Sequence, residues 1–88
     1  METATGNDLS QQVLTAVLAA ARRVHHEDVD ETLDPVSAGF DSIAAVEMAS
    51  LLEEELGVDC TIVDIFDTTS LAELAALLVQ RINDAGGR

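Results

Sequence analysis

The chain has 88 residues, of which 17 are acidic and 4 basic, and its formal net charge at pH 7 is −13. A chain of this length has room for one small domain with a single core. The negative charge argues against binding to nucleic acid or to anionic membranes, because both attract basic surfaces. Hydrophobic residues make up 48% and aromatic residues 2%, which indicates an acidic, aliphatic globular domain whose macromolecular partners carry basic surfaces.

Cys60 is the single cysteine, so the fold contains no internal disulfide. The first four residues carry no positively charged segment of a secretory signal. The longest nearly apolar run, residues 13–21, falls short of the ~20 residues that a membrane-spanning helix needs. We therefore expect a cytoplasmic monomer with no membrane partner.

Apolar residues recur at helical spacing over residues 9–24. Asp8, with Gln11 three residues later, resembles a capping box and predicts a helix that starts near residue 8. We expect a flexible tail over residues 1–7, a folded domain over residues 8–83 and a second tail over residues 84–88.

The helical periodicity disappears between His25 and Asp41. This stretch contains the only proline, Pro35, and six acidic residues. It predicts a long loop held to the core by four apolar residues: Val29, Leu33, Val36 and Phe40. Loops of this length in a small domain are usually functional.

A second helix is predicted from Asp41 or Ser42 to Leu56, with Gly57 as its C-terminal stop. Its inward face consists of Ala45, Met48, Leu51, Leu52 and Leu56. Its outward face carries Glu47, Ser50 and Glu54, with Glu53 near the edge. Ile43 is an apolar residue in the first turn of this outward face.

Two further helices follow. A short one is predicted at residues 62–66, and a longer one starts at Ser70, which forms a capping box with Glu73. Its buried face repeats at Leu71, Leu74, Leu78 and Ile82. The sequence therefore predicts an all-α fold, a small four-helix bundle of three main helices and one short helix, with a long first loop.

The most informative segment is Gly39-Phe40-Asp41-Ser42-Ile43. It places a serine at the first position of a helix, directly after an acidic residue. The helix N-terminus presents unpaired N–H groups and the positive end of the dipole, so a phosphate ester on Ser42 would be well placed. The alternative is that Asp41 or Ser42 is simply an N-cap, a common role for these residues.

This segment is similar to the Gly-x-Asp-Ser-Leu/Ile motif of acyl and peptidyl carrier proteins, which serve fatty-acid, polyketide and nonribosomal-peptide assembly. The resemblance continues over residues 45–48, 52–58 and 65–75, and covers roughly residues 9–82. Residues 65–67 and 70–75 look more like carriers of modular polyketide and peptide synthetases, whereas residues 38–41 lack the double glycine common in peptidyl carriers. The resemblance suggests a discrete carrier of polyketide or nonribosomal-peptide biosynthesis and leaves an acyl or an aminoacyl cargo open.

The resemblance implies a cofactor and a role. In this family, the serine that matches Ser42 is esterified by the phosphopantetheine arm of coenzyme A, in a reaction run by a separate phosphopantetheinyl transferase. The arm then holds acyl or aminoacyl groups as thioesters, and the carrier itself catalyses nothing. Asp41, which matches the family's aspartate, would help the transferase to place its metal and coenzyme at the serine.

The acidic residues of the second helix form a candidate docking face beside Ser42. This face consists of Ile43, Glu47, Ser50, Glu53 and Glu54. Basic partners would be steered to it, among them the acyltransferase, ketosynthase or adenylation-type loading enzymes that the resemblance implies. The alternative is a merely solvated helix face. Exposed ion pairs contribute only about 0.2–1 kcal/mol each, which suits brief docking.

Metal sites are not predicted. The loop from Asp28 starts like a calcium-binding EF-hand, but Leu33 and Gly39 stand where that loop needs a glycine and a bidentate glutamate. His25 and His26 are adjacent on a loop, which is more often incidental than a ligand pair.

Catalytic residues are not predicted either. No motif places a histidine as the base for a nucleophilic Ser42. Cys60 has no basic neighbours in the sequence and is expected to be a small apolar core residue. The competing hypothesis for the whole chain is an acidic helical interaction module that is never modified and in which Ser42 is only a cap.

Overall fold

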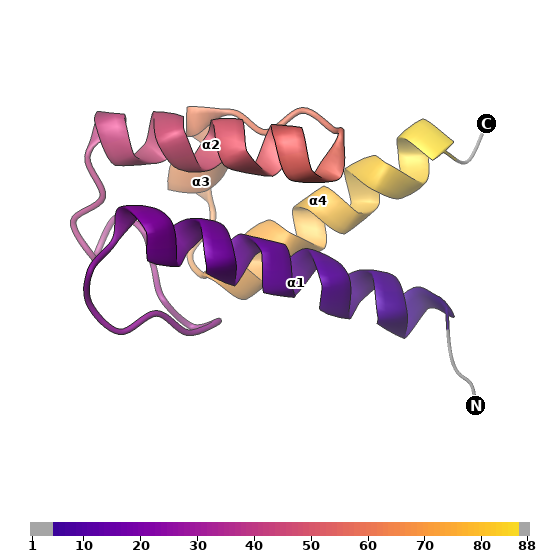
Figure 1. Cartoon of the computed structure of the whole chain (residues 1–88), viewed down its shortest axis with the longest axis horizontal. Helices are drawn as coiled ribbons and strands as arrows, with labels where there is room; N and C mark the ends of the chain where they lie inside the picture. Colours follow the sequence, from indigo (N-terminus) through magenta and orange to yellow (C-terminus); the bar gives the residue numbers. More distant parts are fainter. Residues whose placement is uncertain (1–4, 87–88) are drawn as a thin grey trace.

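The computed structural model describes residues 5–86. Within that range the chain forms four helices and no strand: α1 (Thr5–Val24), α2 (Ser42–Leu56), α3 (Ile62–Asp67) and α4 (Leu71–Gly86) (Figure 1). The predicted all-α bundle with one short helix is confirmed. In the described part of the chain, no helix is both long enough and apolar enough to cross a membrane.

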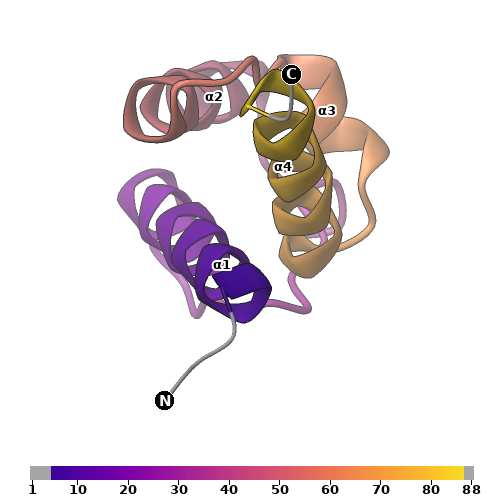
Figure 2. The same ribbon diagram turned by 90° about the vertical axis from the view of Figure 1, so that its right-hand side faces the viewer.

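The core lies among α1, α2 and α4. Figure 2 shows these three helices around a common centre, with α3 at the edge of the bundle. α1 packs against both α2 and α4, and α3 packs against α2. The fully buried side chains come from every helix and include Val13, Val17, Met48, Leu52, Ile65, Leu71, Leu74 and Leu78. The apolar faces predicted for the first, second and last helices therefore form the core, except that Leu51, Leu56 and Ile82 are only partly buried and pack against its margin.

The predicted start of the first helix was wrong. α1 begins at Thr5, so Asp8 lies inside the helix. An acidic residue is favourable anywhere in the first turns because of the helix dipole, so it does not identify the first residue. Residues 5–7 and 84–86, expected as tail, are helical. The remaining expected tail residues, 1–4 and 87–88, lie outside the described residues.

The long loop between α1 and α2 is folded into turns. Asp34 organises its second half: its Oδ1 accepts the N–H of Val36 at 3.0 Å, and its backbone oxygen accepts the N–H of Ala38 at 2.8 Å. This turn buries Pro35 and leaves the Val36 side chain 58% exposed. The expectation that Val36 anchors the loop was therefore wrong, and Pro35 takes that place beside Phe40.

The same loop also caps α4. The backbone oxygens of Leu33 and Glu31 accept the N–H groups of Leu71 and Ala72, at 3.0 and 2.9 Å. These bonds satisfy first-turn donors that have no partner within the helix. A long connection is thus fixed at both ends, to the core by apolar side chains and to α4 by backbone hydrogen bonds.

Half of the capping box predicted at Ser70 is present. The Ser70 Oγ accepts the N–H of Glu73 at 3.1 Å. The carboxylate of Glu73 accepts the N–H of Thr69, at 2.6 Å, where the capping box predicts the N–H of Ser70. The reciprocal bond is therefore shifted by one residue, from Ser70 to Thr69.

Candidate functional site

Ser42 is the first residue of α2, and Asp41 is its N-cap. Asp41 has extended backbone angles, its Oδ1 accepts the N–H of Ala44 at 2.8 Å, and its backbone oxygen accepts the N–H of Ala45 at 3.0 Å. Of the two N-caps that the sequence allowed, the structure selects Asp41. The start of α2 is therefore capped without the hydroxyl of Ser42, and that residue is exposed.

The chain reaches Ser42 through a fixed turn. Gly39 has a φ of +87°, a conformation that favours glycine, and open space surrounds the position of a Cβ there. Phe40 is buried, and the centroid of its ring lies 5.1 Å from the ring centroid of His25, which follows the end of α1. The loop thus turns at Gly39 and is anchored in the core at Phe40. Ser42 therefore follows a fixed segment of chain but is itself exposed.

The residues at this corner suit a phosphate diester on Ser42. The first backbone hydrogen bond of α2 runs from the N–H of Ala45 to the backbone oxygen of Asp41. The N–H groups of Ser42 and Ile43 come before it in the first turn. Such first-turn donors and the positive end of the helix dipole favour an anion. Ile43, with 78% of its surface exposed, places one apolar side chain beside the serine.

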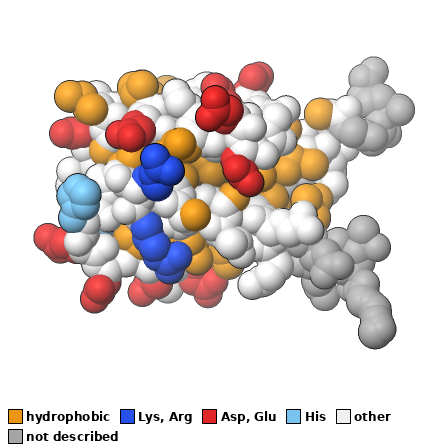
Figure 3. Space-filling model, viewed as in Figure 1, with side chains coloured by type: hydrophobic (Ala, Val, Ile, Leu, Met, Phe, Trp, Pro, Cys, Tyr) orange, Lys and Arg blue, Asp and Glu red, His pale blue; other side chains and the backbone are white. Residues whose placement is uncertain are grey.

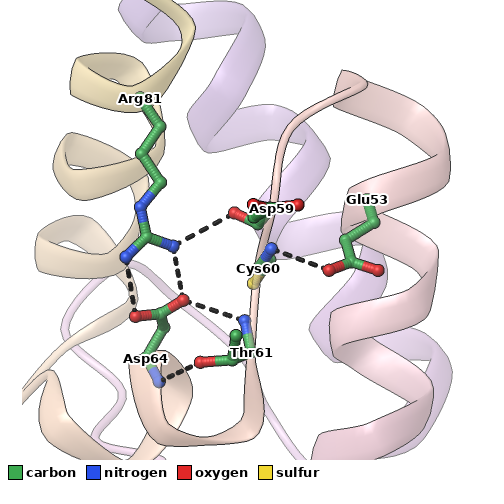
Figure 4. Close-up of polar contacts among 6 residues, drawn as sticks. All are labelled: Glu53, Asp59, Cys60, Thr61, Asp64 and Arg81. Carbon is green, nitrogen blue, oxygen red and sulfur yellow. Dashed lines mark hydrogen bonds and ion pairs between the residues drawn. The ribbon is translucent and has the colours of Figure 1, made fainter. Parts of the chain in front are cut away.

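The five residues of the candidate docking face are exposed, but they do not all lie together. Ile43, Glu47 and Ser50 follow one another at helical spacing along the outer surface of α2. The carboxylate of Glu53 turns toward the connection to α3 and accepts the N–H of Cys60 at 3.0 Å (Figure 4). Glu54 follows Ser50 by four residues on the same stripe as Ile43 and Glu47, and it also borders a groove between α1 and α2.

A polar cluster near the end of α2 was not predicted (Figure 4). Asp64 is 9% exposed and closes a capping box with Thr61 at the start of α3. Arg81 of α4 holds both oxygens of Asp64, with Nη2 at 3.0 Å from Oδ1, and also donates to the backbone oxygen of Asp59 at 3.1 Å. The three-residue spacing of Thr61 and Asp64 could have predicted the capping box. No pattern in the neighbouring sequence predicts that Arg81 pairs with Asp64.

The guanidinium of Arg81, together with hydrogen bonds from Thr61, lowers the pKa of Asp64 to about 2. The nearby Cys60 is buried in the core, as expected, and burial raises the pKa of its thiol to about 11. Such a thiol is protonated at neutral pH and unreactive. This cluster therefore connects α2, α3 and α4 and offers no nucleophile.

Metal ligation finds no support in the described part of the chain, where no three histidine, cysteine or acidic side chains come close enough to hold an ion. His25 contacts Phe40, and His26 is exposed.

Comparison with known proteins identifies the family. Residues 11–78 match the family described as "Phosphopantetheine attachment site". The highly reducing polyketide synthase sor1 of Hypocrea jecorina is 37% identical over 68 residues, which are 77% of this chain and 3% of that protein. The highly reducing polyketide synthase sorA of Penicillium rubens is 35% identical over 68 residues, again 77% of this chain and 3% of the relative. No solved structure matches the chain.

The chain belongs to the phosphopantetheine attachment site family, because the match covers most of its length. It is a carrier protein and not an enzyme, and members of this family bear a phosphopantetheine group covalently on a serine. The carrier role and the cofactor expected from the sequence are thus confirmed. The chain corresponds to only about 3% of the length of these polyketide synthases.

Proposed function

We propose that Ser42 is the serine that carries phosphopantetheine in this chain. The observation that supports this most directly is the division of roles at the start of α2: Asp41 caps the helix, and the exposed hydroxyl of Ser42 remains at its first position. The competing hypothesis gives Ser42 a purely structural role as a cap, and Asp41 already fills that role.

The residues around Ser42 serve attachment and presentation. Ser42 Oγ is the oxygen that would be esterified, and the N–H groups of the first turn would stabilise the diester's charge. When bound, the arm supplies a terminal thiol that holds the cargo as a thioester. The chain contributes a fixed starting point for the arm, because Phe40 anchors the preceding turn in the core.

The partners we propose are a phosphopantetheinyl transferase and loading or condensing enzymes with basic surfaces around their entrances. Ile43, Glu47 and Ser50 form the part of the docking face that runs directly from Ser42. Glu47→Arg should slow transfer between the loaded carrier and such an enzyme by ~two- to fivefold at low salt. Asp84→Arg is the matched control, since it makes the same change in charge at the end of α4, far from the start of α2 (Figure 1). Equal slowing by both variants would contradict a local docking face.

For the cargo we propose an acyl intermediate of polyketide assembly. The support is that the matched relatives are described as highly reducing polyketide synthases. A nonribosomal-peptide pathway with an aminoacyl cargo is the alternative that the sequence left open. The cytoplasmic location expected from the sequence stays a prediction.

The attachment site can be tested by intact mass. The chain is incubated with coenzyme A and a promiscuous phosphopantetheinyl transferase, as wild type, Ser42→Ala and Ser10→Ala. Ser10 is an exposed serine of α1, outside the docking face, and is the control. We expect wild type and Ser10→Ala to gain the mass of one phosphopantetheine and Ser42→Ala to gain none. A mass gain on Ser42→Ala, or none on wild type, would overturn the assignment.

A further inference from the structure

A groove runs between α1 and α2 on the face shown in Figure 3, where an apolar band separates the two helices. It is lined by Gln11, Gln12, Thr15, Ala16, Ala19, Ala20, Arg23, Leu51, Glu54, Glu55 and Leu56. The apolar part comes from three alanines of α1 and two leucines of α2. Of these residues, only Glu54 also belongs to the candidate docking face.

The shape of the groove suits a helix. On α1, Ala16, Ala19 and Ala20 are short side chains at helical spacing, so another backbone can approach α1 closely there. The stretch from Gln12 to Arg23 extends over about 18 Å, three turns of helix. Leu51 and Leu56 form the opposite wall, and both are partly exposed.

The charged residues along the groove differ between its two ends, so they favour one orientation of a bound helix. α1 and α2 run in opposite senses (Figure 1), so the end of α2 with Glu54 and Glu55 lies toward Gln12, and Arg23 lies at the other end. A helix with basic residues at one end and an acidic residue at the other would match this order. The opposite orientation would place like charges together.

We propose that this groove is a docking surface, which adjoins the candidate docking face at Glu54 and binds an amphipathic helix of a basic partner protein. The apolar stripe of that helix covers the alanines and leucines, its lysines or arginines face Glu54 and Glu55, and an acidic residue faces Arg23. A second copy of this chain fits poorly, because each copy carries a charge of −13.

The groove runs along much of α2. Leu51–Leu56 follow Ser42 by 9 to 14 residues, a rise of about 14–21 Å. Arg23 lies at the opposite end of the groove, where the end of α1 meets the chain before α2 through the contact of His25 with Phe40. A partner helix that fills the groove would therefore extend toward the start of α2.

The test uses the unmodified ¹⁵N-labelled chain, so it does not depend on Ser42 being the attachment site. The probe is a synthetic helical peptide with a leucine and alanine stripe, lysines near one end and one glutamate at the other. We expect amide shifts concentrated at Ala16, Ala19, Ala20, Leu51 and Leu56. A peptide with its charges exchanged end for end should bind at least ~tenfold more weakly.

Ala19→Glu is the disruptive variant, because it puts a carboxylate on the apolar floor at an exposed position. Ala76→Glu, at an exposed alanine of α4, is the matched control. We expect at least ~tenfold loss of peptide affinity for the first and none for the second. Circular dichroism of both variants verifies that the fold is retained.

Several outcomes would overturn the proposal. Equal binding of the two peptides, equal affinity of the two variants, or shifts centred on Ile43 and Glu47 would each do so. Shifts at the groove that depend on protein concentration without peptide would indicate a second copy instead. Shifts that arise there when an acyl chain is attached to Ser42, with no effect of peptide, would indicate that the groove holds the cargo.

Discussion

The two ends of α2 are built in different ways. At its start, one carboxylate caps the helix and Ser42 and Ile43 are exposed. Beyond its end at Gly57, charged side chains from α2, α3 and α4 hold the connection in place, with Arg81 and Asp64 at the centre (Figure 4). The first region depends on local hydrogen bonds, and the second depends on contacts between distant parts of the chain.

We infer that the start of α2 presents Ser42, whereas the contacts beyond its end stabilise the fold. The serine that we propose as the attachment site has to reach the active site of a transferase, so few contacts can be made around it. α3 packs mainly on α2, and Arg81 adds a polar connection from α4 to the start of α3. We infer that the stability of the far end allows the Ser42 end to remain open.

Removing Arg81 should have the largest effect. Arg81→Met should lower the free energy of unfolding by ~2–3 kcal/mol, because Asp64 would stay buried without its charged partner. Urea unfolding followed by circular dichroism measures this. Arg22→Met is the control: Arg22 is exposed and makes one long hydrogen bond, at 3.5 Å, so its loss should cost less than about 0.5 kcal/mol. Equal losses would show that Arg81 does not hold the two helices together.

The ion pair should also give stability a specific pH dependence. The pKa of Asp64 in the folded state, about 2, is below its ordinary 3.8. The charged carboxylate therefore stabilises the fold by about 2 kcal/mol above pH 4, and this contribution is lost as the pH falls toward 2. Comparison of wild type with Asp64→Asn separates the contribution of the Asp64 carboxylate from that of the other carboxylates. We expect the stability difference between the two to shrink from pH 5 to pH 2, and a constant difference would contradict the lowered pKa.

The sequence predicted best what depends on neighbouring residues. Helix α2, from Ser42 to Leu56, follows from its apolar periodicity, its acidic cap and the glycine after it. The prediction failed at the start of α1, because an acidic residue does not mark the first residue of a helix.

Contacts between distant segments were also missed. Arg81 is 17 residues from Asp64, and no periodic pattern links them. Glu53 was predicted near the edge of the acidic face of α2, and only the folded path of the chain brings the N–H of Cys60 to its carboxylate. The site residues Asp41 and Ser42 were recognisable because the motif and the helix cap are contiguous.

Substitutions at Asp41 can separate its cap role from its proposed role at the transferase. Asp41→Ala should cost ~1 kcal/mol of stability, whereas Asp41→Asn should cost little, since asparagine is an equally good N-cap. If the carboxylate also helps the transferase to place its metal and coenzyme, both variants should slow modification of Ser42. Mass spectrometry over time measures the rate. Thr61→Ala is the control, because it removes a cap from α3 and should leave that rate unchanged. Modification of Asp41→Asn at the wild-type rate would limit Asp41 to the cap.

Among the described residues, the two glycines with positive φ lie on either side of α2 and allow its two ends to be compared directly. Gly39 and Gly57 have φ values of +87° and +71°, and an added Cβ would meet no atom within 4 Å at either. Alanine at each position should therefore cost only backbone strain, about 1 kcal/mol, which thermal unfolding can measure. Only Gly39→Ala should also slow modification of Ser42, because Gly39 sets the turn that leads into the site. If Gly57→Ala slowed it equally, the presentation of Ser42 would depend on the whole of α2 and not on the turn before it.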